Sequence, residues 1–181
     1  MEPERFFNFP QSAISKASKI KLVLTDVDGV LTDGGITYDS SGNELKTFNS
    51  KDGLGMKLLI KSQLITGIIT GRNSGITERR CKELGVKEYF QDVQDKDRVL
   101  KLLVKKYGVS AEEVAYIGDD WNDLPVFREI GFRVCPADAH EGVKQVVDFV
   151  TNAKGGKGAF RELVDLILLS QGKWMDRFNE F

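Results

Sequence analysis

Short runs of apolar residues alternate along this chain with segments of helical periodicity. Five runs bounded by Gly, Thr, Asp or Pro predict buried strands at residues 20–24, 64–69, 114–117, 132–134 and 148–150. Apolar residues spaced three and four apart predict a helix through Val99, Leu102 and Leu103, and a longer one through Phe160, Leu163, Val164, Ile167 and Leu168. Strands that alternate with helices predict an α/β fold, in which a parallel sheet is covered by helices on both faces.

One segment departs from this alternation. Residues 36–38 and 44–48 are short extended pieces on either side of the turn sequence Ser-Ser-Gly-Asn, and this pattern predicts a β-hairpin that projects from the sheet. A length of 181 residues suggests one main domain, at residues 20–173. Residues 1–19 are expected to form an N-terminal extension with a short helix, and residues 174–181 a mobile C-terminal tail.

Composition and charge disfavour several classes of protein. The 26 basic and 27 acidic residues give a net charge of −1, which argues against a nucleic-acid partner. Two cysteines and one histidine are too few for a zinc site built from several such ligands. No apolar run approaches the roughly 18 residues of a membrane span, and the first ten residues do not read as a secretory signal. The expected protein is cytoplasmic, with no membrane partner.

Acidic and hydroxyl side chains gather where the predicted strands end. The first strand runs into residues 26–29 (Asp-Val-Asp-Gly), the second into 70–72 (Thr-Gly-Arg) and the third into 118–123 (Gly-Asp-Asp-Trp-Asn-Asp). Lys96 begins a predicted helix between the last two segments. Ligands bind at the carboxyl ends of the strands in open α/β sheets. The sequence therefore predicts one site that contains two acidic clusters, a hydroxyl and a lysine.

Such a cluster is expected to bind a cation. Carboxylates placed close together repel one another, and a few carboxylates with room for water suit Mg²⁺. The ion and Lys96 would neutralise the charge of a phosphoryl group, and Thr70 would donate a hydrogen bond to it. A carboxylate in line with the phosphorus could then attack it and form an aspartyl-phosphate. The pattern therefore predicts Mg²⁺-dependent phosphoryl transfer.

The four segments resemble, in chain order, the four motifs of the haloacid dehalogenase superfamily of phosphotransferases. The resemblance implies a Rossmann-like core in which Asp26 is the nucleophile and Asp28 is the general acid and base. It also implies that Thr70 and Lys96 bind the transferred phosphoryl group. An acid at position 28 favours a phosphatase, because it can protonate the leaving alkoxide and later activate water.

The same resemblance implies where Mg²⁺ binds. Asp26 and Asp119 are expected to ligate the ion, together with the backbone carbonyl of Asp28. Asp120 or Asp123 is expected to support the ion through water. Each motif alone is an ordinary turn or helix cap, and it is their joint occurrence in this order that points to a site.

Longer stretches narrow the resemblance to one family. Thr70 follows Asp26 by 44 residues and Lys96 follows Thr70 by 26, and neither interval leaves room for a separate cap domain. Over residues 20–173 the chain resembles the tetrameric 3-deoxy-D-manno-octulosonate 8-phosphate phosphatases, most closely at residues 42–56, 115–126, 137–143 and 148–173. The resemblance implies a capless core, a homotetramer with contacts through the hairpin, and hydrolysis of that sugar-acid phosphate in lipopolysaccharide sugar biosynthesis.

A sugar-acid phosphate is anionic at both ends, so the site needs cations besides Lys96. Arg72 next to the phosphate site, Lys51 just after the hairpin and Arg80 on the following helix are the expected substrate-binding residues. Residues 155–159 read Gly-Gly-Lys-Gly-Ala, where the family usually has arginine in place of the lysine. Related enzymes act on 2-keto-3-deoxynononate 9-phosphate or sialate 9-phosphate. These nine-carbon acids are the alternative substrates.

Two other classes of protein share part of this pattern. A receiver-type signalling module also combines an acidic cluster, a phosphorylatable aspartate, a hydroxyl and a lysine on an α/β sheet. In receivers the acidic pair precedes the phosphorylated aspartate, whereas here the second acidic group comes late and Asp28 closely follows the expected nucleophile. A catalytically silent domain that only drives tetramer formation is the other alternative, although every catalytic position is filled here.

Overall fold

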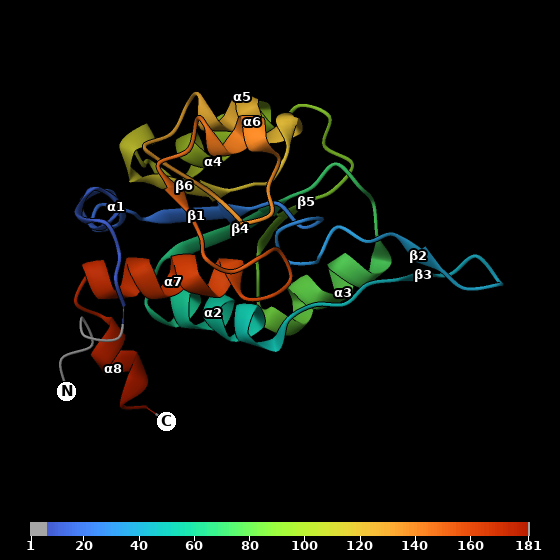
Figure 1. Cartoon of the computed structure of the whole chain (residues 1–181), viewed down its shortest axis with the longest axis horizontal. Helices are drawn as coiled ribbons and strands as arrows, with labels where there is room; N and C mark the ends of the chain where they lie inside the picture. The colour runs from blue at the N-terminus through green and yellow to red at the C-terminus, as the bar shows by residue number, and fades with distance from the viewer. Residues whose placement is uncertain (1–6, 181) are drawn as a thin grey trace.

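The structure, a computed structural model, describes residues 7–180, and a six-stranded sheet lies between two layers of helices (Figure 1). The six strands of this sheet all run parallel, in the order β5-β4-β1-β6-β7-β8. Their bounds are β1 (Leu22–Thr25), β4 (Ile65–Ile69), β5 (Glu88–Phe90), β6 (Val114–Ile117), β7 (Phe132–Cys135) and β8 (Phe149–Val150). The predicted parallel α/β fold is therefore confirmed.

The central strand β1 is apolar because both of its faces are covered. Every residue of β1 is buried, and successive side chains point to opposite faces of the sheet. Val23 belongs to the hydrophobic cluster that includes residues of α2 (Ser50–Lys61), α3 (Gly75–Leu84) and α7 (Ala159–Ser170), whereas Leu22 and Leu24 belong to the cluster on the other face. A strand in this position has no solvent-facing side, so it reads as a continuous apolar run.

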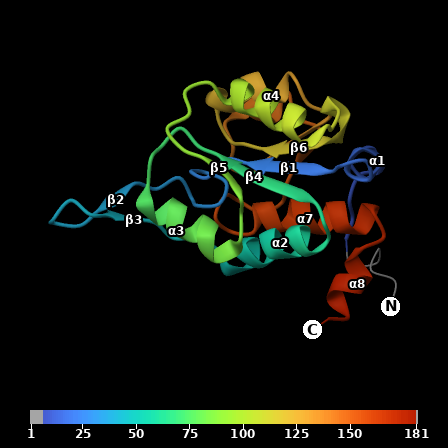
Figure 2. The ribbon, with the colours of Figure 1, turned by 180° about the vertical axis from the view of Figure 1, so that it is seen from behind.

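Helices cover both faces of the sheet, as the two opposite views in Figures 1 and 2 show. One layer contains α4 (Lys96–Tyr107), α5 (Leu124–Phe127) and α6 (Glu141–Lys144), and the other contains α2 (Ser50–Lys61), α3 (Gly75–Leu84) and α7 (Ala159–Ser170). Helices α1 (Gln11–Ala17) and α8 (Trp174–Phe178) both contact α7. None of the helices within residues 7–180 has the length and apolar character needed to cross a membrane.

The predicted extension and tail are described only in part, since residues 1–6 and Phe181 lie outside the described residues. Helix α1 of the extension buries two alanines in the main hydrophobic cluster. The tail contains α8, which sequence periodicity did not predict. The Trp174 indole stacks on Phe178 within this helix and donates to Asp165 Oδ1 over 2.9 Å, so one contact that orders the helix comes from outside it.

Two short strands, β2 (Thr37–Tyr38) and β3 (Glu44–Leu45), form the predicted hairpin, which projects beyond the sheet (Figure 1). Between β1 and β4 the described chain adds only this hairpin and α2, so the core is capless. Strand β5 was not predicted, because it is short and begins with a glutamate. The buried Glu88 carboxylate accepts hydrogen bonds from Lys106 and Tyr107 of α4, both over 2.5 Å.

An ion pair joins β7 to the residue before β8. Arg133 donates to the Asp148 carboxylate from Nε over 3.0 Å and from Nη2 over 2.7 Å, and Lys16 of α1 lies 2.9 Å away. Burial alone would raise the pKa of Asp148, but the hydrogen bonds from Arg133 outweigh burial and hold this pKa at about 2. A carboxylate with a depressed folded pKa stabilises the fold above its unfolded pKa, and this stabilisation is lost as the pH falls through the folded pKa.

An Asp148→Asn variant is therefore expected to be less stable at pH 7 by about 2 kcal/mol. The difference is expected to shrink between about pH 4 and about pH 2, where the original carboxylate takes up its proton. Urea unfolding at a series of pH values measures both quantities, with Asp176→Asn on the exposed surface of α8 as the control. An Asp148→Asn variant as stable as the unsubstituted protein at pH 7 contradicts the prediction.

Candidate active site

An open cavity of about 430 Å³ lies at the carboxyl ends of β1, β4 and β6. These strands are neighbours in the sheet, so the segments that follow them meet at one edge. The lining residues are Asp26, Asp28, Gly34, Thr70, Gly71, Arg72, Asp119, Asp120, Trp121 and Asn122. The structure thus brings the acidic segments and the hydroxyl segment of the sequence to one place.

Three carboxylates lie together beside this cavity. Oxygen atoms of Asp26, Asp119 and Asp123 all lie within 4.8 Å of one another. Burial raises the pKa of Asp26 to about 7, and repulsion from Asp123 adds to the effect. Burial likewise raises the pKa of Asp119 to about 8, with added repulsion from Asp26. The negative charge of the cluster is therefore unfavourable unless a cation joins it.

Lys96 supplies one positive charge to the cluster. It is the first residue of α4, and only 2% of its side chain is exposed. Its ammonium lies 2.6 Å from Asp123 Oδ1 and 3.1 Å from Asp26 Oδ2. Burial lowers the pKa of Lys96, but the charges of Asp26 and Asp123 outweigh burial and hold this pKa above its ordinary value. One lysine leaves the three carboxylates with excess negative charge.

Both oxygens of Asp123 are already engaged. Oδ1 accepts from Lys96 and from the Tyr116 hydroxyl, each over 2.6 Å, and Oδ2 accepts from the backbone N–H groups of Asp119 and Asp120 over 2.9 and 3.3 Å. Among the described residues, each oxygen of Asp26 has only one such partner, the Val27 N–H at Oδ1 and Lys96 at Oδ2. Asp26 and Asp119 are therefore the carboxylates of this cluster with lone pairs left for a cation. Hard oxygen donors beside a cavity with room for water fit Mg²⁺.

The remaining predicted residues of the site line its rim. Thr70 is buried, and its Oγ1 accepts from the backbone N–H of Arg72 over 3.3 Å. The Arg72 guanidinium donates to Glu44 Oε1 over 2.8 Å and to the Tyr38 hydroxyl over 3.4 Å, so the hairpin holds it at the cavity edge. Asp120 accepts from the N–H of Trp121 over 2.7 Å and also lines the cavity.

Two predicted substrate-binding residues do not line this cavity. Lys51 is exposed in the first turn of α2. Arg80 of α3 borders a separate cavity of about 10 Å³, lies 6.0 Å from the centre of the Phe48 ring and pairs with Glu83 over 3.3 Å. Both residues stand on helices that cover a face of the sheet, away from the strand ends that line the cavity.

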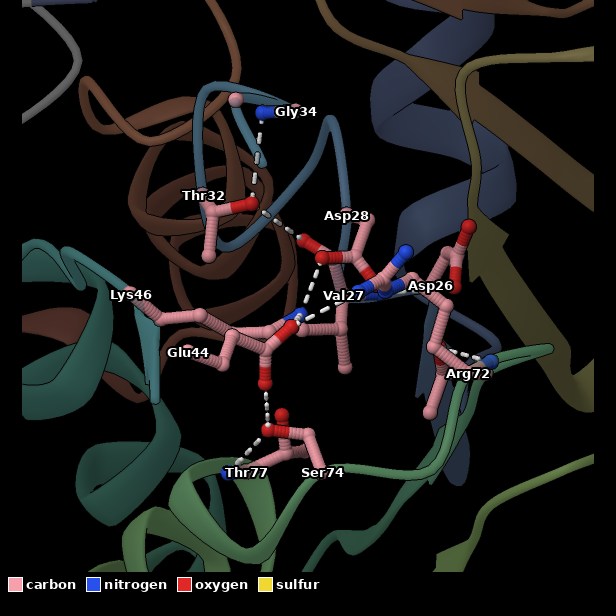
Figure 3. A network of polar contacts seen from close by, with 12 residues as sticks. Asp26, Val27, Asp28, Thr32, Gly34, Glu44, Lys46, Arg72, Ser74 and Thr77 are labelled. Carbon is pink, nitrogen blue, oxygen red and sulfur yellow. Dashed lines mark hydrogen bonds and ion pairs between the residues drawn. The ribbon is translucent and has the colours of Figure 1, made fainter. Parts of the chain in front are cut away.

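Sequence reasoning missed the charged residues of the hairpin. Figure 3 shows the Lys46 ammonium at Asp28 Oδ1 and the Glu44 carboxylate between Ser74 and Arg72. The Ser74 hydroxyl donates to Glu44 Oε2 over 2.5 Å. The spacing of Glu44 and Lys46 could have indicated their position, since alternate residues of a strand share one face. On that reading Glu44 and Lys46 form one charged face of an otherwise exposed hairpin.

The glycine-rich segment 155–159 supports the loop that follows β1. The Gly155 N–H donates to Asp138 Oδ1 and the Gly156 N–H donates to the Val30 carbonyl, each over 2.9 Å. A Cβ at Gly155 would overlap the backbone carbonyl of Gly29. Lys157, by contrast, is exposed. Gly155 and Gly156 are therefore explained by close packing against the acidic loop, whereas Gly158 has open space around it and a φ of +106° that favours glycine.

A substitution at Gly29 tests how closely the loop after β1 packs against Asp119. Gly29 has φ of +92°, and a Cβ there would overlap the Asp119 carboxylate. A Gly29→Ala variant is expected to lose about 1–3 kcal/mol of stability and to bind Mg²⁺ at least about tenfold more weakly, because Asp119 must move. Urea unfolding and titration calorimetry measure the two effects. Gly42→Ala is the control, since Gly42 has φ of +82° and no atom within 4 Å of a Cβ; equal effects in the two variants contradict the prediction.

Comparison with known proteins gives the class to which this fold and site belong. The family of haloacid dehalogenase-like hydrolases matches residues 90–163, which include Lys96 and the acidic segment after β6. The resemblance in the sequence implied a parallel sheet with two aspartates after its first strand and further aspartates after β6. The structure has this arrangement. The fold and the site thus define a haloacid dehalogenase-like hydrolase.

Longer similarity identifies the family within this class. The 3-deoxy-D-manno-octulosonate 8-phosphate phosphatase of Haemophilus influenzae is 48% identical over 158 residues, covering 87% of this chain and 88% of that protein. The chain belongs to the family of 3-deoxy-D-manno-octulosonate 8-phosphate phosphatases. It is therefore a phosphoric monoester hydrolase, and the resemblance seen in the sequence is confirmed.

Solved structures agree with this assignment. The phosphatase of the same name from Yersinia pestis has a TM-score of 0.90 and 42% identity, and the match covers 91% of this chain and 89% of that one. The phosphatase from Moraxella catarrhalis has a TM-score of 0.92 and 42% identity, with 96% and 99% of the two chains covered. That structure was determined in complex with a magnesium ion, a phosphate ion and a KDO molecule.

Proposed function

We propose that this protein hydrolyses 3-deoxy-D-manno-octulosonate 8-phosphate to the free sugar acid and phosphate, with Mg²⁺ as its cofactor. The observation that carries the proposal is that Asp26, Asp28, Thr70 and Asp119 line one cavity, with Lys96 in contact with Asp26. The names of the relatives and the magnesium, phosphate and KDO bound to one of them support the same reaction.

In the first step Asp26 attacks the phosphorus. A bond forms between an Asp26 oxygen and phosphorus, the bond from phosphorus to the ester oxygen breaks, and Asp28 gives its proton to that oxygen. Thr70 and Lys96 hold the phosphoryl oxygens by hydrogen bonds and charge. Asp26, Asp119 and the Asp28 carbonyl would hold Mg²⁺, which when bound supplies further positive charge to the phosphoryl oxygens.

In the second step water hydrolyses the aspartyl-phosphate formed at Asp26. Asp28, now a carboxylate, takes a proton from water while the water oxygen attacks the phosphorus, and the bond between phosphorus and Asp26 breaks. Phosphate leaves, Asp26 is again a carboxylate and Asp28 is again protonated. Asp123 keeps Lys96 and the Asp119 loop in place through its four hydrogen bonds, and Asp120 would support the ion through water.

Cations at the rim of the cavity are proposed to bind the sugar acid. Arg72 lines the cavity in its own chain. Lys51 and Arg80 would have to act from a neighbouring copy, because neither lines the cavity of its own chain. The nine-carbon acids 2-keto-3-deoxynononate 9-phosphate and sialate 9-phosphate carry the same charges and are the alternative substrates.

A homotetramer is part of the proposal. Ile36, Tyr38 and Leu45 lie on or beside the projecting hairpin, and more than half of each is exposed. Exposed apolar residues that cluster on one element are typical of an interface between chains. Sedimentation velocity tests this part. A particle of four chains supports it, and a monomer at micromolar concentration contradicts it.

A reducing, cytoplasmic location is proposed as well. Cys81 and Cys135 are both buried and carry free thiols. Reduced cysteines of this kind are usual in the cytosol, where disulfides are rare. Fractionation of cells that produce the tagged full-length chain tests the location.

Phosphate release from a panel of esters tests the function. The panel holds the octulosonate 8-phosphate, both nine-carbon phosphates and simple hexose phosphates, each with Mg²⁺ and with EDTA. Preference for the octulosonate that is lost with EDTA is the expected result. Preference for a nine-carbon acid would keep the mechanism and change the substrate. A folded, Mg²⁺-binding protein that turns over none of them would contradict the proposal.

A further inference from the structure

Lys46 is a buried cation at the edge of the proposed active site. It follows the exposed Leu45 on the hairpin, yet only 3% of its side chain is exposed. Its ammonium contacts Asp28 Oδ1 and lies 3.8 Å from Glu44 Oε1. Lysine is rarely buried without a charged partner, so these two carboxylates account for its position.

Glu44 fastens the base of the hairpin through hydrogen bonds with two residues outside the hairpin. Its Oε2 accepts from the Ser74 hydroxyl over 2.5 Å, and its Oε1 accepts from the Arg72 guanidinium over 2.8 Å (Figure 3). These bonds connect the hairpin to the segment between β4 and α3. The hairpin is thus held by contacts other than the one between Lys46 and Asp28.

The Asp28 side chain has few other restraints. Within the described chain Oδ2 is buried and has no hydrogen-bond partner, and Arg72 Nε lies 4.0 Å from it. The side chain is 20% exposed and lines the cavity. Among residues 7–180, Lys46 is thus the side chain that fixes this carboxylate by a hydrogen bond.

We propose that Lys46 is a positioning residue that acts on the reaction through Asp28. This rests on the proposed function, in which Asp28 gives a proton to the leaving oxygen and later takes one from water. Lys46 holds Oδ1 and so keeps the carboxyl group in one orientation toward the cavity, while the transferred proton still comes from Asp28. Without Lys46 the carboxyl group can rotate, and a displacement of about 1 Å costs on the order of 10²-fold in rate.

A double-mutant cycle tests the coupling. With Mg²⁺ and 3-deoxy-D-manno-octulosonate 8-phosphate, Lys46→Met is expected to lower kcat about 10²-fold and to leave KM within about threefold, since Lys46 acts on Asp28. Lys46→Arg keeps a cation, and its kcat is expected to be about tenfold higher than that of Lys46→Met. In an Asp28→Asn background Lys46→Met is expected to change kcat by less than about threefold. Lys57→Met, on the exposed surface of α2, is the matched control.

The leaving group provides an independent readout. Nitrophenolate leaves p-nitrophenyl phosphate without needing a proton, whereas an alkoxide needs one. With enzyme in excess over ester, nitrophenolate release by Lys46→Met is expected to stay within about threefold of the unsubstituted rate. Under the same conditions release of the sugar acid is expected to fall about 10²-fold.

Equal losses with the two esters, or additive losses in the double variant, overturn the proposal, because Lys46 would then act on the phosphoryl group or on the fold. If circular dichroism shows that Lys46→Met does not fold, Lys46→Arg with the two esters answers the same question. An unsubstituted chain that is inactive toward the whole panel of esters overturns the proposed function. That failure can be told apart from the others, because it is seen in the unsubstituted protein without any variant.

Discussion

An Asp26→Asn variant is expected to release phosphate on the order of 10⁴-fold more slowly than the unsubstituted protein. In the proposed mechanism an Asp26 oxygen forms the bond to phosphorus, and a neutral amide is a poor nucleophile. The fold is expected to persist, because an amide oxygen can still accept the 2.7 Å hydrogen bond from the Val27 N–H. The substitution also removes a charge that burial disfavours, as the raised pKa of Asp26 indicates.

Phosphate release at saturating Mg²⁺ and octulosonate 8-phosphate measures this loss, and urea unfolding checks that the variant is folded. Asp176→Asn makes the same chemical change on the exposed surface of α8 and is expected to keep the full rate. A folded Asp26→Asn variant with an unchanged rate would mean that the nucleophile is another residue.

The second large effect is expected at Lys96. Its ammonium is the positive partner of Asp26 and Asp123 and also lies 3.2 Å from the Tyr116 hydroxyl. Removing one partner of a buried ionic cluster leaves uncompensated charge, so Lys96→Met is expected to lower the free energy of unfolding by about 3–5 kcal/mol. Phosphate release is expected to fall below detection, because Lys96 also holds the phosphoryl group in the proposed mechanism.

Urea unfolding of the Lys96→Met variant measures the loss of stability. Unfolding with and without Mg²⁺ then tests whether the missing positive charge causes that loss. A divalent cation that binds the folded state restores part of the lost stability, because it replaces the missing positive charge and because binding to the folded state stabilises it. Lys101→Met is the control on the same helix. Lys101 forms an exposed pair with Asp97, so its loss is expected to change the free energy of unfolding little. A Lys96→Met variant as stable as this control contradicts the prediction.

Strand positions were predictable where a buried apolar run ends in an acid or a hydroxyl. Strand β6 has the bounds that the sequence predicted, and β4 ends at the predicted residue. Strand β5 was missed because its Glu88 is buried only through hydrogen bonds from Lys106 and Tyr107, which come from another element. A charged residue in a short run reads as a loop until such partners are known.

Substrate binding by Lys51 and Arg80 stays a prediction. Lys51 and Arg80 follow the hairpin and the Thr-Gly-Arg segment closely in sequence, but helices α2 and α3 place them outside the cavity of their own chain. No role for Glu44 or Lys46 was predicted from the sequence. Their side chains lie against Asp28 and Arg72, because the base of the hairpin lies beside the segments that follow β1 and β4.

By itself the sequence determined the fold class, the acidic segments and the family, because each of these depends on local patterns of residues. Apolar runs define the strands of a buried parallel sheet, and acidic turns at their ends meet at one edge. Only the tertiary structure decided which charges meet. The pair Lys46–Asp28 joins residues 18 positions apart and the pair Lys96–Asp123 joins residues 27 apart. Which side chains pair at that edge depends on how the strands, the helices and the hairpin pack, and local patterns do not specify these pairs.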